Sequence, residues 1–258
     1  MATPVALVTG ASRGIGKRLS VDLANAGYDV VCAARTSRES PSKLPGTVDE
    51  TAEAVVRAGR RALPVALDVQ DEGAVAALAD RVYAEWGRCD LLVNNAAIAP
   101  PKPALADTVR RWRMAVDVNL NGPFYLMYHL CPRMLAAGGG RVINVSSAAA
   151  VMPTFGRPSY TATKLALEGL TEALGHELAG RVAVNCIRID IPIWSEGFDA
   201  TLPADFDQSY FEDAIIMTDA VLWLLRQELS YTGKVITLGE LRVQGIVRPP
   251  TTAQCAPR

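Results

Sequence analysis

Short apolar runs alternate in this chain with longer segments in which apolar residues recur every three or four positions. Residues 5–8 are apolar without interruption and predict a buried strand. Ile15, Leu19 and Leu23 then recur at helical spacing, and the same alternation repeats along the chain. Because the predicted strands are apolar on both faces, we expect a parallel sheet covered by helices on both sides.

The predicted elements form one uninterrupted series. Strands are predicted at residues 5–8, 30–33, 62–67, 91–93, 141–145, 182–189 and 234–238. Helices are predicted at 15–26, 47–59, 71–86, 107–137, 159–178 and 218–229. No linker or repeat divides the series, and its crossovers should be right-handed. We therefore predict an α/β fold, a single doubly wound Rossmann domain over residues 1–258 with about seven parallel strands.

The charge balance argues against several classes of protein. Half of the 258 residues are hydrophobic, and 26 basic side chains stand against 27 acidic ones. Nucleic-acid-binding proteins normally show a basic excess, and a membrane span needs roughly 20 apolar residues in a row. We therefore expect no nucleic-acid partner and no membrane span, and the uncharged N-terminal residues give no sign of a signal peptide.

Cysteine and histidine are too sparse for a disulfide framework or a metal centre. The five cysteines are widely spaced and form no CxxC pair, and the chain has only two histidines. This usage predicts a reducing, cytoplasmic location and no bound metal.

The first predicted strand ends in a glycine-rich turn, residues 9–16, with the sequence Thr-Gly-Ala-Ser-Arg-Gly-Ile-Gly. Glycine permits a tight strand-to-helix turn and close approach of the backbone to a pyrophosphate, which the N–H groups at a helix start attract. A purely structural turn is the alternative. The place of the motif, between the first strand and the first helix, favours a dinucleotide site.

Tyr160 and Lys164 lie one helical turn apart on one face of a predicted helix. Such a pair arises often by chance and indicates little alone. Three further polar elements strengthen it: Asn-Asn-Ala-Ala at 94–97, Asn119 in the next helix, and Ser-Ser at 146–147. They fall near the carboxyl ends of predicted strands, where open parallel sheets bind ligands.

Together these motifs resemble those of the short-chain dehydrogenase/reductase family, and the resemblance covers nearly the whole chain. The segment 94–97 stands for the family's Asn-Asn-Ala-Gly. The resemblance implies hydride transfer between a nicotinamide cofactor and a carbonyl or alcohol. It also implies the catalytic residues Asn119, Ser147, Tyr160 and Lys164.

The implied roles suit the chemistry of these side chains. Tyr160 would be the general acid in carbonyl reduction and the base in alcohol oxidation. A free phenol titrates near 10, and we expect the ammonium of Lys164 to lower the pKa of Tyr160. Lys164 would also hold ribose hydroxyls. Ser147, rather than Ser146, would donate to the substrate oxygen, and Asn119 would hold a water linking Lys164 to solvent.

The end of the second strand bears on the choice of cofactor. An acidic residue there would bind the 2′-hydroxyl of NAD(H) and repel the 2′-phosphate of NADP(H). That position is Ala34 here, and Arg35 follows it, with Arg13 on the same side of the expected pocket. We therefore expect NADP(H) rather than NAD(H). Arg38 and Lys43 are better explained as solvated charges.

The full expected cofactor site combines the turn with several strand ends. It comprises Gly10, Ser12, Arg13, Gly14, Ile15, Gly16, Arg35, Asp68, Val69, Asn95, Ala96, Tyr160, Lys164, Ile191 and Ile193. Asp68 would accept from the adenine amino group. The loop at 36–46 is longer than usual and is similar to that of hydroxysteroid-dehydrogenase-like proteins and some terpenoid alcohol dehydrogenases.

After the sixth predicted strand the chain departs from the family's pattern. The usual Pro-Gly pair is Ile-Asp at 189–190. Pro192, which has no N–H, stands where the family's backbone binds the nicotinamide carboxamide. We expect that contact to shift to Ile191 or Ile193, with Ser195 replacing a threonine near the pyrophosphate.

A substrate lid is expected at about residues 192–217. Its aromatic residues are Trp194, Phe198, Phe206, Tyr210 and Phe211, and its acidic residues are Glu196, Asp199, Asp205, Asp207, Glu212 and Asp213. No Lys or Arg occurs between Arg188 and Arg226. The carboxylates either repel anionic substrates or merely solvate the loop. Both interpretations favour an uncharged, fairly apolar carbonyl or alcohol.

Three functions follow from these residues. The first is an NADP(H)-dependent oxidoreductase, and the second is an NAD-dependent alcohol dehydrogenase running oxidatively. The third is a catalytically silent dinucleotide-binding regulator, which only the altered segment at 189–192 favours.

The two long predicted helices bear on assembly. The helix at 159–178 has more apolar residues than one sheet face needs, namely Leu165, Leu167, Leu170 and Leu174. Family members pair these helices, so the resemblance implies a homotetramer.

Overall fold

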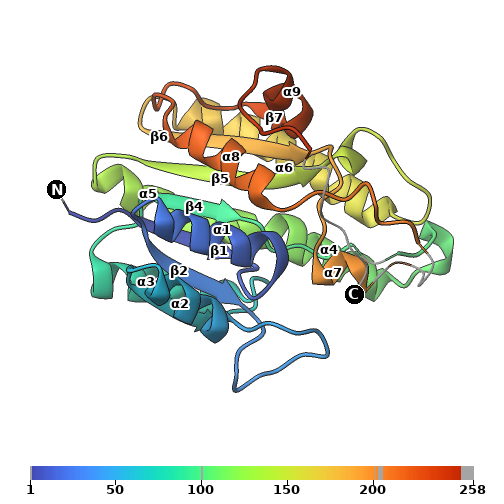
Figure 1. The fold of residues 1–258 in the computed structure, drawn as a ribbon, viewed down its shortest axis with the longest axis horizontal. Helices are drawn as coiled ribbons and strands as arrows, with labels where there is room; N and C mark the ends of the chain where they lie inside the picture. The colour runs from blue at the N-terminus through green and yellow to red at the C-terminus, as the bar shows by residue number, and fades with distance from the viewer. Residues whose placement is uncertain (1, 100, 201, 203–205, 251–258) are drawn as a thin grey trace.

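The computed structural model describes residues 2–99, 101–200, 202 and 206–250. At its centre lies a seven-stranded parallel sheet in the order β3-β2-β1-β4-β5-β6-β7 (Figure 1). The strands are β1 Val5–Thr9, β2 Asp29–Ala34, β3 Ala62–Ala66, β4 Leu91–Asn94, β5 Gly140–Ser147, β6 Val182–Ile189 and β7 Val235–Thr237. The predicted doubly wound parallel sheet is confirmed.

Helices connect the strands and cover both faces of the sheet (Figure 1). The longer ones are α1 Gly14–Asn25, α2 Val48–Arg57, α3 Glu72–Trp86, α4 Val109–Val116, α5 Gly122–Ala136, α6 Pro158–Glu177 and α8 Ile215–Leu225. The short ones are η1 Ala104–Ala106, η3 Ala148–Ala150, α7 Glu196–Asp199 and α9 Leu238–Val243.

Successive residues of each central strand enter two different hydrophobic cores. Val8 of β1 packs in one core with Leu19 of α1 and Val221 of α8. Its neighbour Leu7 packs in the other core with Leu130 of α5. Because both faces of β1 are buried, the run of apolar residues that predicted the strand is what the fold requires.

The order of the strands reverses between β1 and β4, which pair directly with Ala6 opposite Leu91. At such a point the connections leave toward opposite faces, so the carboxyl edge opens between the two strands. The arrows in Figure 1 point toward the side where α4 and α7 lie. This edge is therefore where a site is expected.

The helix predicted at 107–137 is interrupted by a π-helical turn, η2 Asp117–Asn121, between α4 and α5. Such turns are rare and are often found at functional sites. Gly122, which follows the turn, packs closely against Val69. A Cβ at this position would lie 2.8 Å from Cγ2 of Val69. The turn carries Asn119, which is fully buried.

The C-terminal elements differ most from the prediction. α8 occupies Ile215–Leu225 rather than 218–229, and Oδ1 of Asp213, just before the helix, accepts the N–H of Ile215 at 2.7 Å. Leu238 begins α9 instead of ending β7, because Thr237 and Glu240 form a capping box there. α7 and α9 were not predicted.

None of the helices in the described part of the chain is both long and apolar enough to cross a membrane. Four cysteines, Cys32, Cys89, Cys131 and Cys186, are buried free thiols, and Cys255 lies outside the described residues. Burial raises the pKa of each of the four thiols to about 12, so they pack as neutral side chains.

Candidate functional site

Side chains from three elements meet at the carboxyl edge of the sheet. Ser147 ends β5, Tyr160 and Lys164 lie on the first turns of α6, and Asn119 lies in η2. The side chain of Ser147 is hydrogen-bonded to that of Tyr160. The four predicted catalytic residues are thus brought together, although their roles remain predictions.

Lys164 is buried and held by the backbone of β5. Only 2% of the residue is exposed, and Nζ donates to the carbonyl oxygen of Val145 at 2.6 Å. The ammonium lies 5.7 Å from the ring centroid of Tyr160. Burial lowers the pKa of Lys164 to about 8, while Cys186 and Glu168 act in the opposite direction. The lysine therefore titrates close to physiological pH.

The pKa of Tyr160 moves opposite to the prediction. Burial raises it above its ordinary value, and only the hydrogen bond to Ser147 and the charge of Arg157 lower it. The sequence argument considered the charge of Lys164 and left out the desolvation of the phenol. Burying the charged phenolate costs more free energy than these contacts supply, so burial favours the neutral phenol.

Asn119 joins three segments. Its Oδ1 accepts the N–H of Ile98 at 2.8 Å, and its Nδ2 donates to the carbonyl of Ile98 at 2.8 Å and to Oγ1 of Thr163 at 3.1 Å. Both amide hydrogens are therefore used by protein partners. The side chain fixes η2 against α6 and the segment after β4, and a water-holding role remains a prediction.

The two serines at the end of β5 have different surroundings. Ser146 is buried, and its Oγ donates to Oε1 of Glu168 at 2.7 Å. Ser147 is only half-buried, and its Oγ accepts the N–H of Ala149 at 3.3 Å. Ser146 lies on the face of β5 that packs against α6, whereas Ser147, at the end of the strand, is the serine bonded to Tyr160.

The glycine-rich turn is packed so closely that its glycines are required. Gly10 and Gly14 have φ angles of +66° and +52°. A Cβ at Gly16 would lie 2.3 Å from the carbonyl oxygen of Gly10. Across the turn, Thr9 Oγ1 accepts the N–H groups of Asn95 and Ala96 at 3.0 and 3.1 Å. The predicted cofactor residues that follow β4 are therefore bonded directly to the turn.

The turn already binds an anion from elsewhere in the chain. Oε2 of Glu196, on α7, accepts the N–H of Gly14 at the start of α1 at 2.9 Å. A helix start attracts negative charge because its first N–H groups have no partner within the helix. This carboxylate shows that the turn suits a bound pyrophosphate, so the residues present fit a dinucleotide.

Arg13 is enclosed by the long loop that follows β2, which projects from the lower part of the molecule in Figure 1. Its Nε donates to the carbonyl of Pro45 at 2.8 Å, and its Nη2 donates to Oγ of Ser42 at 2.8 Å. The carbonyls of Leu44 and Gly46 accept from the same Nη2 at 3.2 Å. The loop thus orients Arg13 in addition to any contact with a phosphate.

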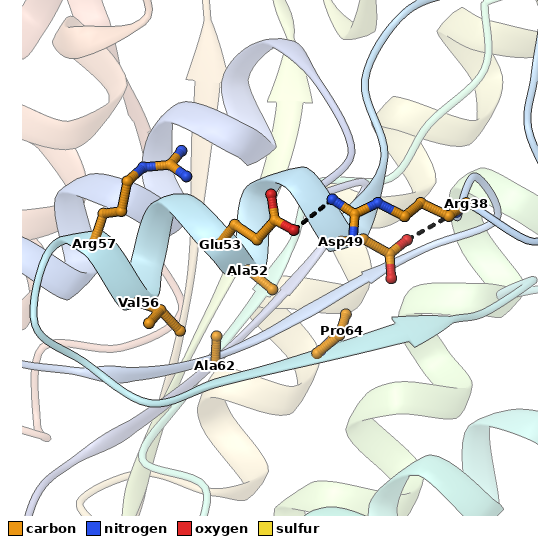
Figure 2. A pocket seen from close by; sticks show the side chains of 8 residues that line it. All are labelled: Arg38, Asp49, Ala52, Glu53, Val56, Arg57, Ala62 and Pro64. Atoms are coloured by element: carbon orange, nitrogen blue, oxygen red, sulfur yellow. Dashed lines mark hydrogen bonds and ion pairs between the residues drawn. The ribbon is translucent and has the colours of Figure 1, made fainter.

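The other basic residues of this region differ in their surroundings. Arg35 is exposed at the end of β2. Figure 2 shows the guanidinium of Arg38 paired with Glu53 beside an open groove of about 440 Å³ between α2 and the edge strand β3. The backbone N–H of Arg38 donates to Oδ2 of Asp49 at 2.8 Å. Arg38 therefore has partners on α2, and Lys43 is exposed on the loop.

Asp68, the predicted adenine contact, and Asp190, in the altered segment after β6, both accept hydrogen bonds from other residues of the protein. Oδ1 of Asp68 accepts from the backbone and the side chain of Gln70 at 3.1 Å. Oδ1 of Asp190 accepts the N–H of Gly239 at 3.0 Å, which ties the end of β6 to α9. An acidic residue at 190 therefore has a structural reason. Ile193 is buried and pairs with Glu212.

Two acidic residues of the predicted lid form ion pairs with arginines outside it. Glu212 forms an ion pair with Arg242 at 2.6 Å, and Asp213 forms one with Arg18 at 2.8 Å. Asp199 accepts from Gln208 at 2.6 Å. Asp205 lies outside the described residues. The sequence argument overlooked partners from α1 and α9, so the lid is less negative than its composition indicates.

Sequence reasoning missed three acidic residues that shape the site: Glu168, Asp190 and Glu196. Glu168 had a signal, because it follows Tyr160 and Lys164 at the same helical spacing and is a carboxylate on a buried face. The partners of Asp190 and Glu196 are distant in sequence, and no spacing points to them.

A family model described as short chain dehydrogenase matches residues 4–191. The chain belongs to the short-chain dehydrogenase family. The family that the motifs suggested is thus confirmed.

Relatives within the short-chain dehydrogenases are moderately similar. Hydroxysteroid dehydrogenase-like protein 2 of Bos taurus is 29% identical over 242 residues, covering 93% of this chain but 57% of that protein. This chain therefore spans little more than half the length of that relative. The 2-dehydro-3-deoxy-D-gluconate 5-dehydrogenase of Dickeya dadantii is 33% identical over 233 residues, which is 88% of this chain and 85% of that protein.

A solved structure is also similar throughout. The crystal structure of a metagenomic short-chain oxidoreductase in complex with NADP has a TM-score of 0.76 and 31% identity, covering 92% of this chain and 96% of that chain.

Proposed function

We propose that this short-chain dehydrogenase is an NADP(H)-dependent oxidoreductase that interconverts a ketone or aldehyde and the corresponding alcohol. The proposal rests on one observation, the grouping of Ser147, Tyr160 and Lys164 at the carboxyl edge of the sheet. Dinucleotide binding alone would not require a phenol and a buried ammonium beside each other.

The chain's own residues would handle the proton. Tyr160 carries its proton at neutral pH, since a free phenol titrates near 10 and burial raises the pKa further; this is the form that a general acid needs for carbonyl reduction. Ser147 would donate to the same carbonyl oxygen, and Lys164 would stabilise the phenolate left after proton transfer. The nicotinamide supplies or accepts the hydride when bound. In the oxidative direction Tyr160 would accept the proton instead.

The preference for NADP(H) rests on charge at the end of β2. Ala34 leaves the acidic position empty, and Arg35 is exposed beside it. Arg13 is oriented by the loop, and its Nη1 takes part in none of the contacts found among the described residues. The metagenomic relative in complex with NADP supports this preference. The remaining predicted cofactor residues line the turn and the adjoining strand ends.

The substrate is proposed to be uncharged and fairly apolar. Residues 192–217 are the proposed lid, and they present the aromatic side chains of Trp194, Phe206 and Tyr210 to solvent. Because Glu212 and Asp213 are neutralised by ion pairs, apolar contact is the stronger argument for this substrate class.

A homotetramer and a cytoplasmic location are proposed as well. Of the four leucines that suggested an interface, Leu165 is exposed, Leu167 is buried, and Leu170 and Leu174 pack against the core. Phe124 and Tyr128 on α5 are exposed and support the interface better. The buried free thiols suit a reducing compartment.

The test is a comparison of cofactors followed by a substrate screen. NADPH and NADH are titrated against the protein by fluorescence, and a panel of neutral ketones and aldehydes is then screened for nicotinamide oxidation. We expect tighter binding of NADPH and turnover of apolar carbonyls. Preference for NADH with alcohol oxidation would favour the second function, and binding without turnover of any substrate would favour the silent regulator.

A further inference from the structure

Glu168 is a carboxylate buried beneath the candidate catalytic residues. It lies on α6 one helical turn beyond Lys164, and only 4% of it is exposed. Burying an ionised carboxylate is costly unless it is paired and hydrogen-bonded. Glu168 therefore needs hydrogen-bond and ion-pair partners that offset the free energy of its desolvation.

The partners come from the two strands next to α6. Oε1 accepts from Oγ of Ser146 at 2.7 Å and from Nε of Arg188 at 2.9 Å. Oε2 accepts from Nη2 of Arg188 at 2.7 Å. Glu168 therefore joins β5, α6 and β6 through a bidentate ion pair and a hydroxyl.

The contact with Ser146 reaches the catalytic group through the backbone. Ser146 lies between Val145, whose carbonyl holds the ammonium of Lys164, and Ser147, which bonds to Tyr160. Fixing Ser146 therefore fixes both of its neighbours. Because Glu168 does not itself touch the phenol, it acts through other residues.

The charges around Lys164 come from two elements. Glu168 and Tyr160 face it from α6, and Cys186 and Arg188 lie on β6. Cys186 is neutral because burial raises the pKa of its thiol to about 12. The carboxylate of Glu168 is thus an anion near the ammonium of Lys164. Its ion pair with Arg188 offsets part of that negative charge.

We propose that Glu168, with Arg188, is a positioning residue for Lys164 that sets both the place and the charge of its ammonium. The assignment of Lys164 rests on the proposed function, but its titration can be observed without a substrate. Removing the anion and removing its counterion should then affect Lys164 in opposite directions. A merely structural contact would not do so.

The experiment uses selective ¹³C labelling of lysine side chains and NMR titration of the intact protein. The chain has five lysines, Lys17, Lys43, Lys102, Lys164 and Lys234, so the spectrum is simple. The signal of Lys164 is assigned by its absence in Lys164→Met. Titration midpoints are compared for Glu168→Gln, Arg188→Met and the double variant, with Glu172→Gln on the exposed face of α6 as the matched control.

Glu168→Gln should lower the midpoint of Lys164 by on the order of one pH unit, because an attracting anion is lost and Arg188 remains. Arg188→Met should raise it, because the anion is no longer offset. The Lys164 midpoint of the double variant should lie between those of the single variants and below that of the parent protein. Glu172→Gln should leave the midpoint unchanged. Thermal unfolding is followed in parallel, since an unpaired buried charge destabilises the fold.

Equal midpoints in all variants, or shifts in the same direction for both single variants, would overturn the proposal. If Arg188→Met does not fold, the double variant must still titrate above Glu168→Gln. If Glu168→Gln does not fold, the double variant must still titrate below the parent protein. A protein that titrates as expected but turns over no substrate would refute the proposed function and leave this inference intact.

Discussion

Tyr160 is the side chain on which the proposed chemistry depends. Tyr160→Phe removes the phenolic proton and keeps the ring, so we expect turnover to fall by at least about 10²-fold. The dissociation constant of NADPH should change little, because the phenol acts on a proton. Steady-state rates and fluorescence titration of the same variant provide the two measurements. Near-normal turnover would contradict the mechanism.

Arg35 should decide between the two cofactors. Arg35→Asp places an acidic side chain beside the proposed 2′-phosphate position, so NADPH binding should weaken and the preference should be lost or reversed. Dissociation constants for NADPH and NADH measure the effect. Lys43→Asp makes the same charge change on the neighbouring loop and serves as the control. An equal loss in both variants would indicate only a general field effect.

Lys164 should make the fold less stable at neutral pH. Its pKa is lowered to about 8 in the folded protein, whereas the unfolded value is 10.5. Between these pH values the unfolded chain binds more protons, so stability rises with pH. The penalty is complete below pH 8.

Lys164→Met removes that penalty. The variant should therefore gain stability relative to the parent protein at pH 7, and its advantage should shrink as the pH rises from 8 toward 10.5. Thermal unfolding across this range measures the difference. An advantage that grows with pH would show that the pKa of Lys164 is not depressed.

The residues of the site were predictable to different degrees. Ser147, Tyr160 and Lys164 were predicted because several motifs together resemble the short-chain dehydrogenase family, and the resemblance implies these residues. The raised pKa of Tyr160 was not predicted, because it depends on burial, which spacing does not reveal. The loop contacts of Arg13 were missed for a similar reason, since they involve backbone carbonyls that any residue could supply.

At the scale of elements, the contact between α7 and the start of α1 should weaken cofactor binding. Oε2 of Glu196 occupies an N–H that a pyrophosphate would approach. Glu196→Gln removes the negative charge there and should tighten the binding of NADPH and NADH by a similar factor, about 2- to 10-fold. Titration of both cofactors measures this.

Asp199→Asn is the matched control, because it removes a charge from the same short helix without a contact to the turn. It should leave both dissociation constants unchanged. Weaker binding in Glu196→Gln would mean that this carboxylate supports the cofactor site and does not compete for it.

Helices and strands were predictable where the pattern of apolar residues in the local sequence is enough to determine them. The long strands and α1 were predicted because apolar runs and helical spacing agree with burial on both sheet faces. The π turn η2 was not predicted, because no local sequence pattern indicates a break within residues 107–137. The early start of α8 was missed because Asp213, which accepts the N–H of Ile215, was assigned to the lid.

For the whole molecule, exposed apolar residues on α5 and α6 predict self-association. Phe124, Tyr128 and Leu165 are exposed where a partner could cover them. We expect a tetrameric mass by light scattering, and Tyr128→Glu should shift the mass toward smaller species without loss of secondary structure. A monomeric mass at micromolar concentration would contradict the assembly.

The overall architecture was predictable because each strand is apolar on both faces, and only a covered parallel sheet buries such strands. The long-range ion pairs were not predictable in this way. Glu212 and Arg242 are distant in sequence, as are Arg18 and Asp213, and charge composition alone made the lid look uniformly acidic.

The bond between Glu196 and Gly14 also has a kinetic consequence. An uncharged substrate brings no anion that could compete for this N–H, whereas a dinucleotide does. If release of this contact also opens the carbonyl site, binding follows a compulsory order, with the dinucleotide entering first and leaving last. A dead-end analogue of the carbonyl substrate would therefore inhibit uncompetitively with respect to NADPH, and Glu196→Gln would relax that pattern toward random addition.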